Sequence, residues 1–126
     1  MRNGVDFLAD TNVLIYVLED HPVVKGIIQC SVAVSVITEI ELLGKKGISL
    51  QEKEEVCSLL DDCELLNFTN EIKKLTIALK QQHTLKTPDA IIVATAKYFG
   101  LTLITADKKL KNINGIDVIL LDLLQK

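Results

Sequence analysis

Apolar residues form short runs along the chain, and these runs alternate with longer segments of helical periodicity. Short runs rich in valine, leucine and isoleucine are typical of buried strands when polar residues bound them. Because helical segments lie between most of the runs, we expect right-handed crossover connections. The pattern predicts an α/β fold, a three-layer α/β/α sandwich with a mostly parallel central sheet. The predicted strands are residues 5–10, 31–37, 63–68, 101–105 and 117–121.

The clearest helix start is the sequence Thr87-Pro88-Asp89. A hydroxyl residue can cap the first turn, proline fits the first helical position, and an acid is favoured by the helix dipole. Gly100 should end this helix. Further helices are predicted after residue 10, over 38–44, from Ser49 with its capping-box partner Glu52, and over 70–83.

The chain has 126 residues, of which 48% are hydrophobic and 25% are charged. This is the balance of an ordinary globular protein, and the length fits one domain, so we expect residues 1–126 to form a single unit. Asp6 and Asp10 interrupt the first apolar segment, which therefore lacks a signal-peptide core. No apolar run approaches the roughly 18 residues of a membrane helix. We therefore expect a cytoplasmic protein without a membrane segment.

The net charge is −3, from 14 lysine and arginine residues against 17 acids. Nucleic-acid-binding proteins usually have a basic face, because they neutralise phosphates. If four carboxylates belong to one metal site, however, the remaining 13 acids are outnumbered by the 14 basic residues. A bound divalent cation would make the local field more positive still. The net charge therefore does not exclude a nucleic-acid substrate.

Four acids are expected near the ends of the predicted strands. Asp10 ends the first strand, Glu41 follows the second, Asp89 lies in the first turn of the clearest helix, and Asp107 stands two residues past the strand 101–105. Ligands of open parallel sheets bind at the carboxyl ends of the strands. Taken singly, each acid is also explained as a helix cap, a turn residue or a solvated side chain. Their shared placement favours one site.

Helical geometry separates the two neighbouring acids Glu39 and Glu41. At about 100° per residue, Glu41 falls near Ile37, and Glu39 falls on the far side of the helix. We therefore expect Glu41 to face inward at an edge of the core and Glu39 to face solvent.

Other catalytic chemistry is poorly represented. His21 and His83 do not stand beside a serine or cysteine, the cysteine spacings match no zinc motif, and the six glycines lie singly. Carboxylates are the candidate catalytic groups that remain, and a ligand set made of oxygens alone suits Mg²⁺ or Mn²⁺.

Four segments resemble the PIN-domain family of metal-dependent nucleases, in the family's order. They are LADTNVLIY (8–16), VSVITEIEL (34–42), TPDAIIVATA (87–96) and LTLITAD (101–107). Within the family the chain looks most like the stand-alone VapC-type toxins of toxin–antitoxin modules. The resemblance implies that Asp10, Glu41, Asp89 and Asp107 are the catalytic, metal-binding residues, with Thr11 and Thr105 in supporting positions.

By the same resemblance, the protein is expected to hydrolyse RNA phosphodiester bonds with Mg²⁺ or Mn²⁺ as cofactor. A cognate antitoxin is the implied partner, and a homodimer is a family expectation. Many relatives carry an acid and an aromatic residue shortly after the fourth acid, whereas Lys108, Lys109 and Leu110 stand here. Lysines beside the acidic segments are candidate phosphate contacts or ordinary surface residues: Lys45, Lys46, Lys86, Lys108 and Lys109.

Two alternatives belong to other functional classes. A phosphoacceptor receiver domain needs a strand near mid-chain that ends in aspartate, but residues 49–62 have a helical pattern. A catalytically inactive PIN fold that binds RNA or protein stays open, although the complete set of four acids argues against it.

Overall fold

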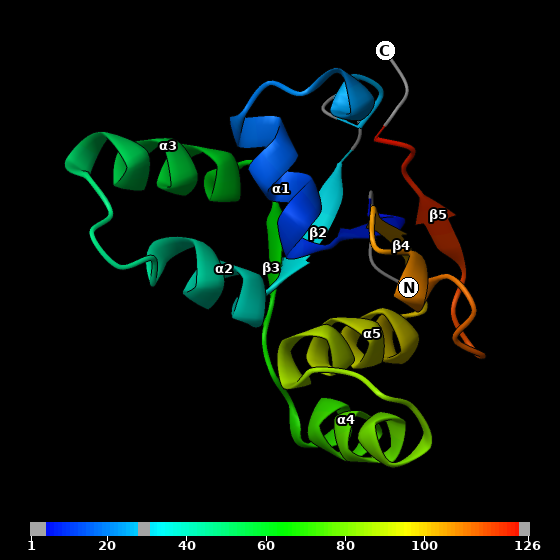
Figure 1. Ribbon diagram of the computed structural model, residues 1–126. Coiled ribbons are helices and arrows are strands. Elements are labelled where there is room, and N and C mark those ends of the chain that lie inside the picture. The colour runs from blue at the N-terminus through cyan, green and yellow to red at the C-terminus, as the bar shows by residue number, and fades with distance from the viewer. Residues whose placement is uncertain (1–4, 28–30, 124–126) are drawn as a thin grey trace.

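The computed structural model describes residues 5–27 and 31–123, and within them five strands form one sheet (Figure 1). The strand order is β3-β2-β1-β4-β5, and every neighbouring pair is parallel. The predicted α/β class with a parallel sheet is therefore confirmed. The strands are β1 (Phe7–Ala9), β2 (Val32–Ser35), β3 (Glu64–Leu66), β4 (Thr102–Thr105) and β5 (Val118–Leu120).

Helices cover both faces of the sheet. Figure 1 shows α4 and α5 side by side on one face, whereas α1 lies on the other and α2 and α3 extend outward beside it. This arrangement confirms the three-layer sandwich. The helices are α1 (Thr11–Leu18), α2 (Val36–Leu43), α3 (Leu50–Asp61), α4 (Asn70–Gln82) and α5 (Thr87–Phe99), with short 3₁₀ turns η1 (Pro22–Val24) and η2 (Lys108–Leu110).

Successive side chains of a strand enter different halves of the core. In β1, Leu8 packs in the cluster that contains Ile72 of α4 and Ile92 of α5, whereas Ala9 packs in the cluster of Val13 from α1. Side chains on neighbouring positions of a strand point to opposite faces, and here both faces are covered. This double coverage explains the continuous apolar run of the central strand β1.

The predicted strand 31–37 is too long at its carboxyl end. The Ser35 hydroxyl oxygen accepts a hydrogen bond from the backbone N–H of Ile37 at 3.1 Å, so Ser35 caps α2, which begins at Val36. Valine and isoleucine favour strands, and this local preference obscured the capping serine. The helix therefore starts earlier than predicted.

Two predicted helix caps have different outcomes. The capping box of Ser49 and Glu52 at the start of α3 is confirmed. The hydroxyl cap at Thr87 is wrong, because Lys86 is the N-cap of α5 and makes no side-chain capping bond, and Thr87 is already helical. Proline in the first turn fixes a helical backbone angle, which helps this helix to begin without a side-chain cap.

The strand order reverses between β1 and β4. From β1 the chain proceeds to β2 and β3 on one side, and β4 and β5 extend the sheet on the other side. In open parallel sheets, ligand sites form outside the carboxyl ends of strands at such a reversal. Asp10 follows β1 and Asp107 lies just past β4, so both acids lie at the carboxyl ends of the two strands where the order reverses. Within the described part of the chain, no helix has both the length and the apolar composition needed to span a membrane.

Candidate active site

Asp10 is the most deeply placed acid of the candidate site. It is only 3% exposed and caps the N-terminus of α1. Its Oδ1 accepts a hydrogen bond from the Thr11 backbone N–H at 2.7 Å, and its Oδ2 accepts one from the Thr105 hydroxyl at 2.7 Å. Burial raises the pKa of Asp10, as do the charges of Asp89 and Asp107, while the two hydrogen bonds act in the opposite direction. Both carboxylate oxygens are thus held in place.

Thr105 joins the ends of β1 and β4. Its buried hydroxyl donates to Asp10 and accepts a hydrogen bond from the Asp107 backbone N–H at 3.0 Å. Asp107 in turn caps η2, where its Oδ1 accepts from the Lys109 backbone N–H at 3.0 Å. The lysine pair that replaces the expected acid and aromatic residue therefore forms a turn that orients Asp107.

Glu41 is attached to the site through Thr11. The Thr11 hydroxyl donates to Glu41 Oε1 at 2.6 Å and shares a second hydrogen bond with the Thr38 hydroxyl at 2.9 Å. These contacts connect α2 to the first turn of α1, directly after Asp10. Glu41 therefore lies next to the strand ends although it belongs to a helix at the periphery.

The expected burial of Glu41 is wrong. Glu41 is exposed, Glu39 is half-buried, and Ile40 is 58% exposed. The buried side chains of α2 are Thr38 and Leu42. Ile37 packs against the core as expected, but its neighbour on the inner face is Thr38, which hydrogen-bonds to α1, and Glu41 lies outside that face.

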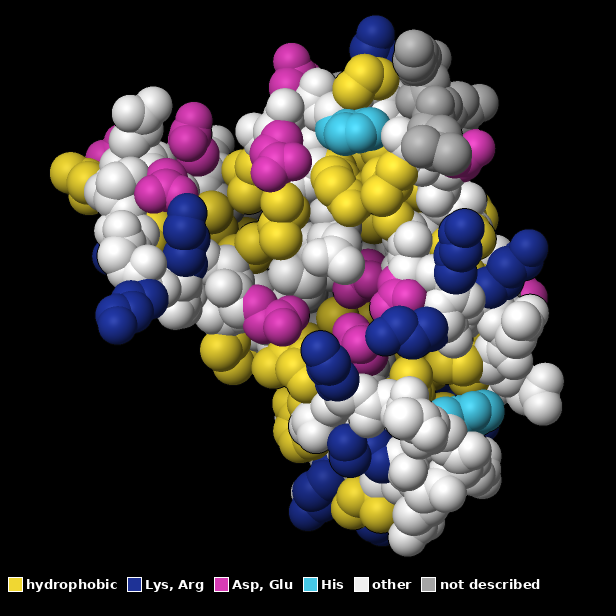
Figure 2. All heavy atoms as spheres, viewed as in Figure 1, with side chains coloured by type: hydrophobic (Ala, Val, Ile, Leu, Met, Phe, Trp, Pro, Cys, Tyr) yellow, Lys and Arg dark blue, Asp and Glu magenta, His cyan; other side chains and the backbone are white. Residues whose placement is uncertain are grey.

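Asp89 lies close enough to Asp107 and Glu41 to be affected by the charges of both. It is half-buried in the first turn of α5, and burial raises its pKa, followed by the charges of Asp107 and Glu41. The ammonium groups of Lys109 and Lys86 act in the opposite direction. Figure 2 shows acidic side chains gathered in the middle of this face of the molecule, with lysines beside them. The four predicted acids therefore influence one another as a cluster.

The donor set of this cluster suits a hard divalent cation. All four side chains are carboxylates, which are the ligands that Mg²⁺ and Mn²⁺ prefer. Burial raises the pKa values of Asp10 and Asp89 most, and a cation would relieve the mutual repulsion that adds to this effect. Among residues 5–27 and 31–123, no three His, Cys, Asp or Glu side chains are grouped closely enough to hold a metal ion as they stand. The chemistry fits a metal, and coordination requires the carboxylates to draw closer.

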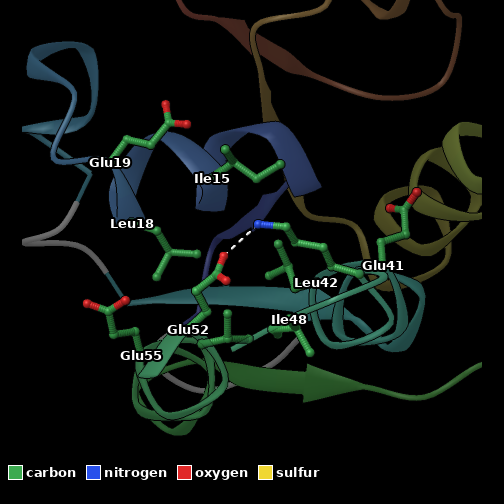
Figure 3. A pocket seen from close by; sticks show the side chains of 10 residues that line it. Ile15, Leu18, Glu19, Glu41, Leu42, Ile48, Glu52 and Glu55 are labelled. Atoms are coloured by element: carbon green, nitrogen blue, oxygen red, sulfur yellow. Dashed lines mark hydrogen bonds and ion pairs between the residues drawn. The ribbon is translucent and has the colours of Figure 1, made fainter. Parts of the chain in front are cut away.

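A groove of about 490 Å³ adjoins Glu41 between α1, α2 and α3. In Figure 3, Glu41 stands at one end of this groove, and Glu19 and Glu55 stand at the other. Sequence reasoning did not predict it, because its walls come from three separate helices. Its apolar lining is Ile15, Leu18, Leu42, Ile48 and Val56, and Lys45, paired with Glu52, completes it.

Comparisons with known proteins show the family and the fold of the chain. The family model of the PIN domain matches residues 7–116. A toxin–antitoxin complex from Klebsiella pneumoniae contains a chain 32% identical to this one, with a TM-score of 0.76, over 89% of this chain and 94% of that chain. FitAcB from Neisseria gonorrhoeae is 26% identical, with a TM-score of 0.74, over 90% and 96% of the two chains.

VapBC2 from Rickettsia felis, solved with a DNA fragment from its promoter, shares the fold at 21% identity. Its TM-score is 0.78, and the match covers 94% of this chain and 99% of that chain. No curated protein sequence matches the chain. Because the PIN-domain model covers residues 7–116 and solved toxin–antitoxin structures share the fold, the chain belongs to the PIN domain family.

Proposed function

We propose that this protein is a metal-dependent endoribonuclease and the toxin of a toxin–antitoxin pair. PIN domains are nucleases in general. The observation that carries the proposal is the placement of acids from separate segments beside one another: Thr105 joins Asp10 to the Asp107 backbone, Thr11 joins Glu41 to the turn after Asp10, and the charges of Asp107 and Glu41 add to the burial that raises the pKa of Asp89. Clustered carboxylates destabilise a metal-free fold, so their presence is best explained by a cation that they bind.

Asp10, Asp89 and Asp107 are the proposed ligands of Mg²⁺ or Mn²⁺, and Glu41 is a further ligand or the base that orients water. The bound ion would stabilise charge on the phosphoryl oxygens and lower the pKa of a water molecule. Thr11 and Thr105 hold Asp10 by a hydrogen bond to each of its oxygens. Since carboxylate oxygens retain free lone pairs when they accept one hydrogen bond, Asp10 can be fixed and still bind a cation.

The lysines near the site support an RNA substrate. The charges of Lys86 and Lys109 act to lower the pKa of Asp89, and the three side chains border a hollow of about 210 Å³. Lys45, in contrast, is paired with Glu52. We therefore propose that Lys86 and Lys109 contact the phosphates of single-stranded or looped RNA, because ammonium groups bind phosphate oxygens favourably.

The groove beside Glu41 supports an antitoxin partner. The similar proteins from Klebsiella pneumoniae and Neisseria gonorrhoeae were solved as a toxin–antitoxin complex and as FitAcB, respectively. The groove combines an apolar floor with the carboxylates of Glu19, Glu41 and Glu55. A segment with apolar side chains and basic residues would be complementary to it.

Action in the cytoplasm and homodimer formation are further parts of the proposal.

RNA cleavage by the purified protein tests this function. We expect cleavage with Mg²⁺ or Mn²⁺, its complete loss with EDTA, and its loss in Asp10→Asn. Asp62→Asn is the matched control, because Asp62 is an exposed residue at the end of α3. Undiminished cleavage after thorough chelation would contradict the metal mechanism. Absence of cleavage with both metals on a broad set of RNAs would favour the binding-only alternative.

A further inference from the structure

Thr38 is a buried polar residue that the predicted site did not include. Its side chain is 0% exposed, and it lies one helical turn before Glu41 on α2. A buried hydroxyl requires a hydrogen-bond partner, and the Thr38 Oγ1 lies 2.9 Å from the Thr11 Oγ1. This contact joins α2 to α1 in the interior of the protein.

The direction of this hydrogen bond follows from the number of protons available. The Thr11 hydroxyl lies 2.6 Å from Glu41 Oε1 and donates to it. An ionised carboxylate only accepts, and a hydroxyl has only one proton to donate. Thr11 must therefore accept in its contact with Thr38, and Thr38 must donate. The hydrogen bonds run from Thr38 to Thr11 to Glu41.

We propose that Thr38 is a positioning residue for Glu41, which acts by directing the Thr11 proton toward the carboxylate. The proposal rests on the proposed function insofar as Glu41 is part of the nuclease site. Glu41 is exposed, so its side chain would otherwise sample several rotamers. Successive hydrogen bonds polarise and strengthen one another, which favours the rotamer that lies beside Thr11 and Asp10.

Two substitutions separate the hydroxyl of Thr38 from its packing. Thr38→Val keeps the shape of the side chain and removes the donor. Thr38→Ser keeps the donor and removes a buried methyl group, which leaves a small cavity. If Thr38 only fills space, Thr38→Ser should be the more harmful change. If the Thr38 proton directs Thr11, Thr38→Val should disorder the Glu41 side chain more than Thr38→Ser does.

Side-chain NMR of the metal-free protein gives a readout that does not depend on activity. Three-bond couplings about the Glu41 Cα–Cβ bond should indicate one main rotamer in the wild type and in Thr38→Ser, and rotamer averaging in Thr38→Val. Averaged couplings in the wild type, or unchanged couplings in Thr38→Val, would overturn the proposal. Equal averaging in both variants would also overturn it, because the methyl group and not the hydroxyl would then be responsible.

Kinetics with Mn²⁺ provide the second readout. We expect Thr38→Val to lower kcat for RNA cleavage about tenfold with little change in KM, as the loss of one hydrogen bond in a charged network would do. Thr38→Ser should restore kcat even if its melting temperature falls. A wild type that cleaves no RNA but shows the predicted couplings would refute the proposed function and leave the role of Thr38 intact. A normal kcat in Thr38→Val together with a disordered Glu41 side chain would refute the role of Thr38 in catalysis.

Discussion

The two corners of the candidate site are built in different ways. The strand corner consists of Asp10, Thr105 and Asp107, and backbone pairing of β1 with β4 fixes it. The helix corner consists of Thr11, Thr38 and Glu41, and side-chain hydrogen bonds between α1 and α2 hold it. Asp10 is buried, whereas Glu41 is exposed. The strand corner is therefore preorganised by the fold, and the helix corner depends on a few hydroxyl groups.

The largest expected effect distinguishes two acids on α2. Glu41→Gln should lower the rate of RNA cleavage by orders of magnitude, because it removes a charge that acts on Asp89 and a proposed ligand or base. Glu39→Gln should change the rate by less than about threefold, as substitutions outside a functional contact usually do. Cleavage rates of both variants with Mn²⁺ provide the test. If Glu39 is essential and Glu41 is dispensable, the resemblance to the PIN family has been aligned on the wrong acid of α2.

The next effect concerns the lysines beside Asp89. Lys86→Gln and Lys109→Gln should each raise KM for RNA by about three- to tenfold with little change in kcat, since each removes one phosphate contact. Lys45→Gln should leave KM nearly unchanged, because Lys45 is paired with Glu52 away from Asp89. Steady-state kinetics at several salt concentrations measure this difference. Equal effects of all three substitutions would indicate a general electrostatic contribution instead of specific contacts.

The smallest effect is on the stability of the metal-free protein. Burial raises the pKa of Asp10 above its ordinary 3.8, so the folded protein binds this proton more tightly than the unfolded chain does. As the pH falls through the raised pKa, Asp10 therefore contributes increasing stability, which is complete below 3.8. Asp10→Asn lacks the buried charge and should be more stable than the wild type at neutral pH.

That advantage of Asp10→Asn should shrink as the pH falls, because the wild-type carboxyl becomes neutral. Urea unfolding of both proteins in EDTA between neutral and mildly acidic pH measures it, with Asp62→Asn as the exposed control. An advantage that does not vary with pH would mean that the buried charge of Asp10 is not its source.

The strand corner could be predicted from sequence better than the helix corner. Runs of apolar residues locate β1 and β4, and the sequence order then places Asp10 and Asp107 at their carboxyl ends. The helix corner depends on which side chains of α2 are buried: Ile37 packs against the core, but Glu41, which helical geometry places near it, is exposed, and Thr38 is fully buried. A buried threonine that bonds to another helix has no sequence pattern of its own. The groove could not be predicted from the sequence either, because side chains from three separate helices form its walls.

Mn²⁺ binding tests most directly the claim that the two corners and Asp89 form one metal site. Isothermal titration of the metal-free protein should show saturable binding, which Asp10→Asn, Glu41→Gln, Asp89→Asn and Asp107→Asn each weaken strongly, because each substitution removes a negative charge from the site. Asp62→Asn should bind Mn²⁺ as the wild type does. Wild-type affinity in the four variants, or weakening confined to the strand corner, would contradict a single site built from all four acids.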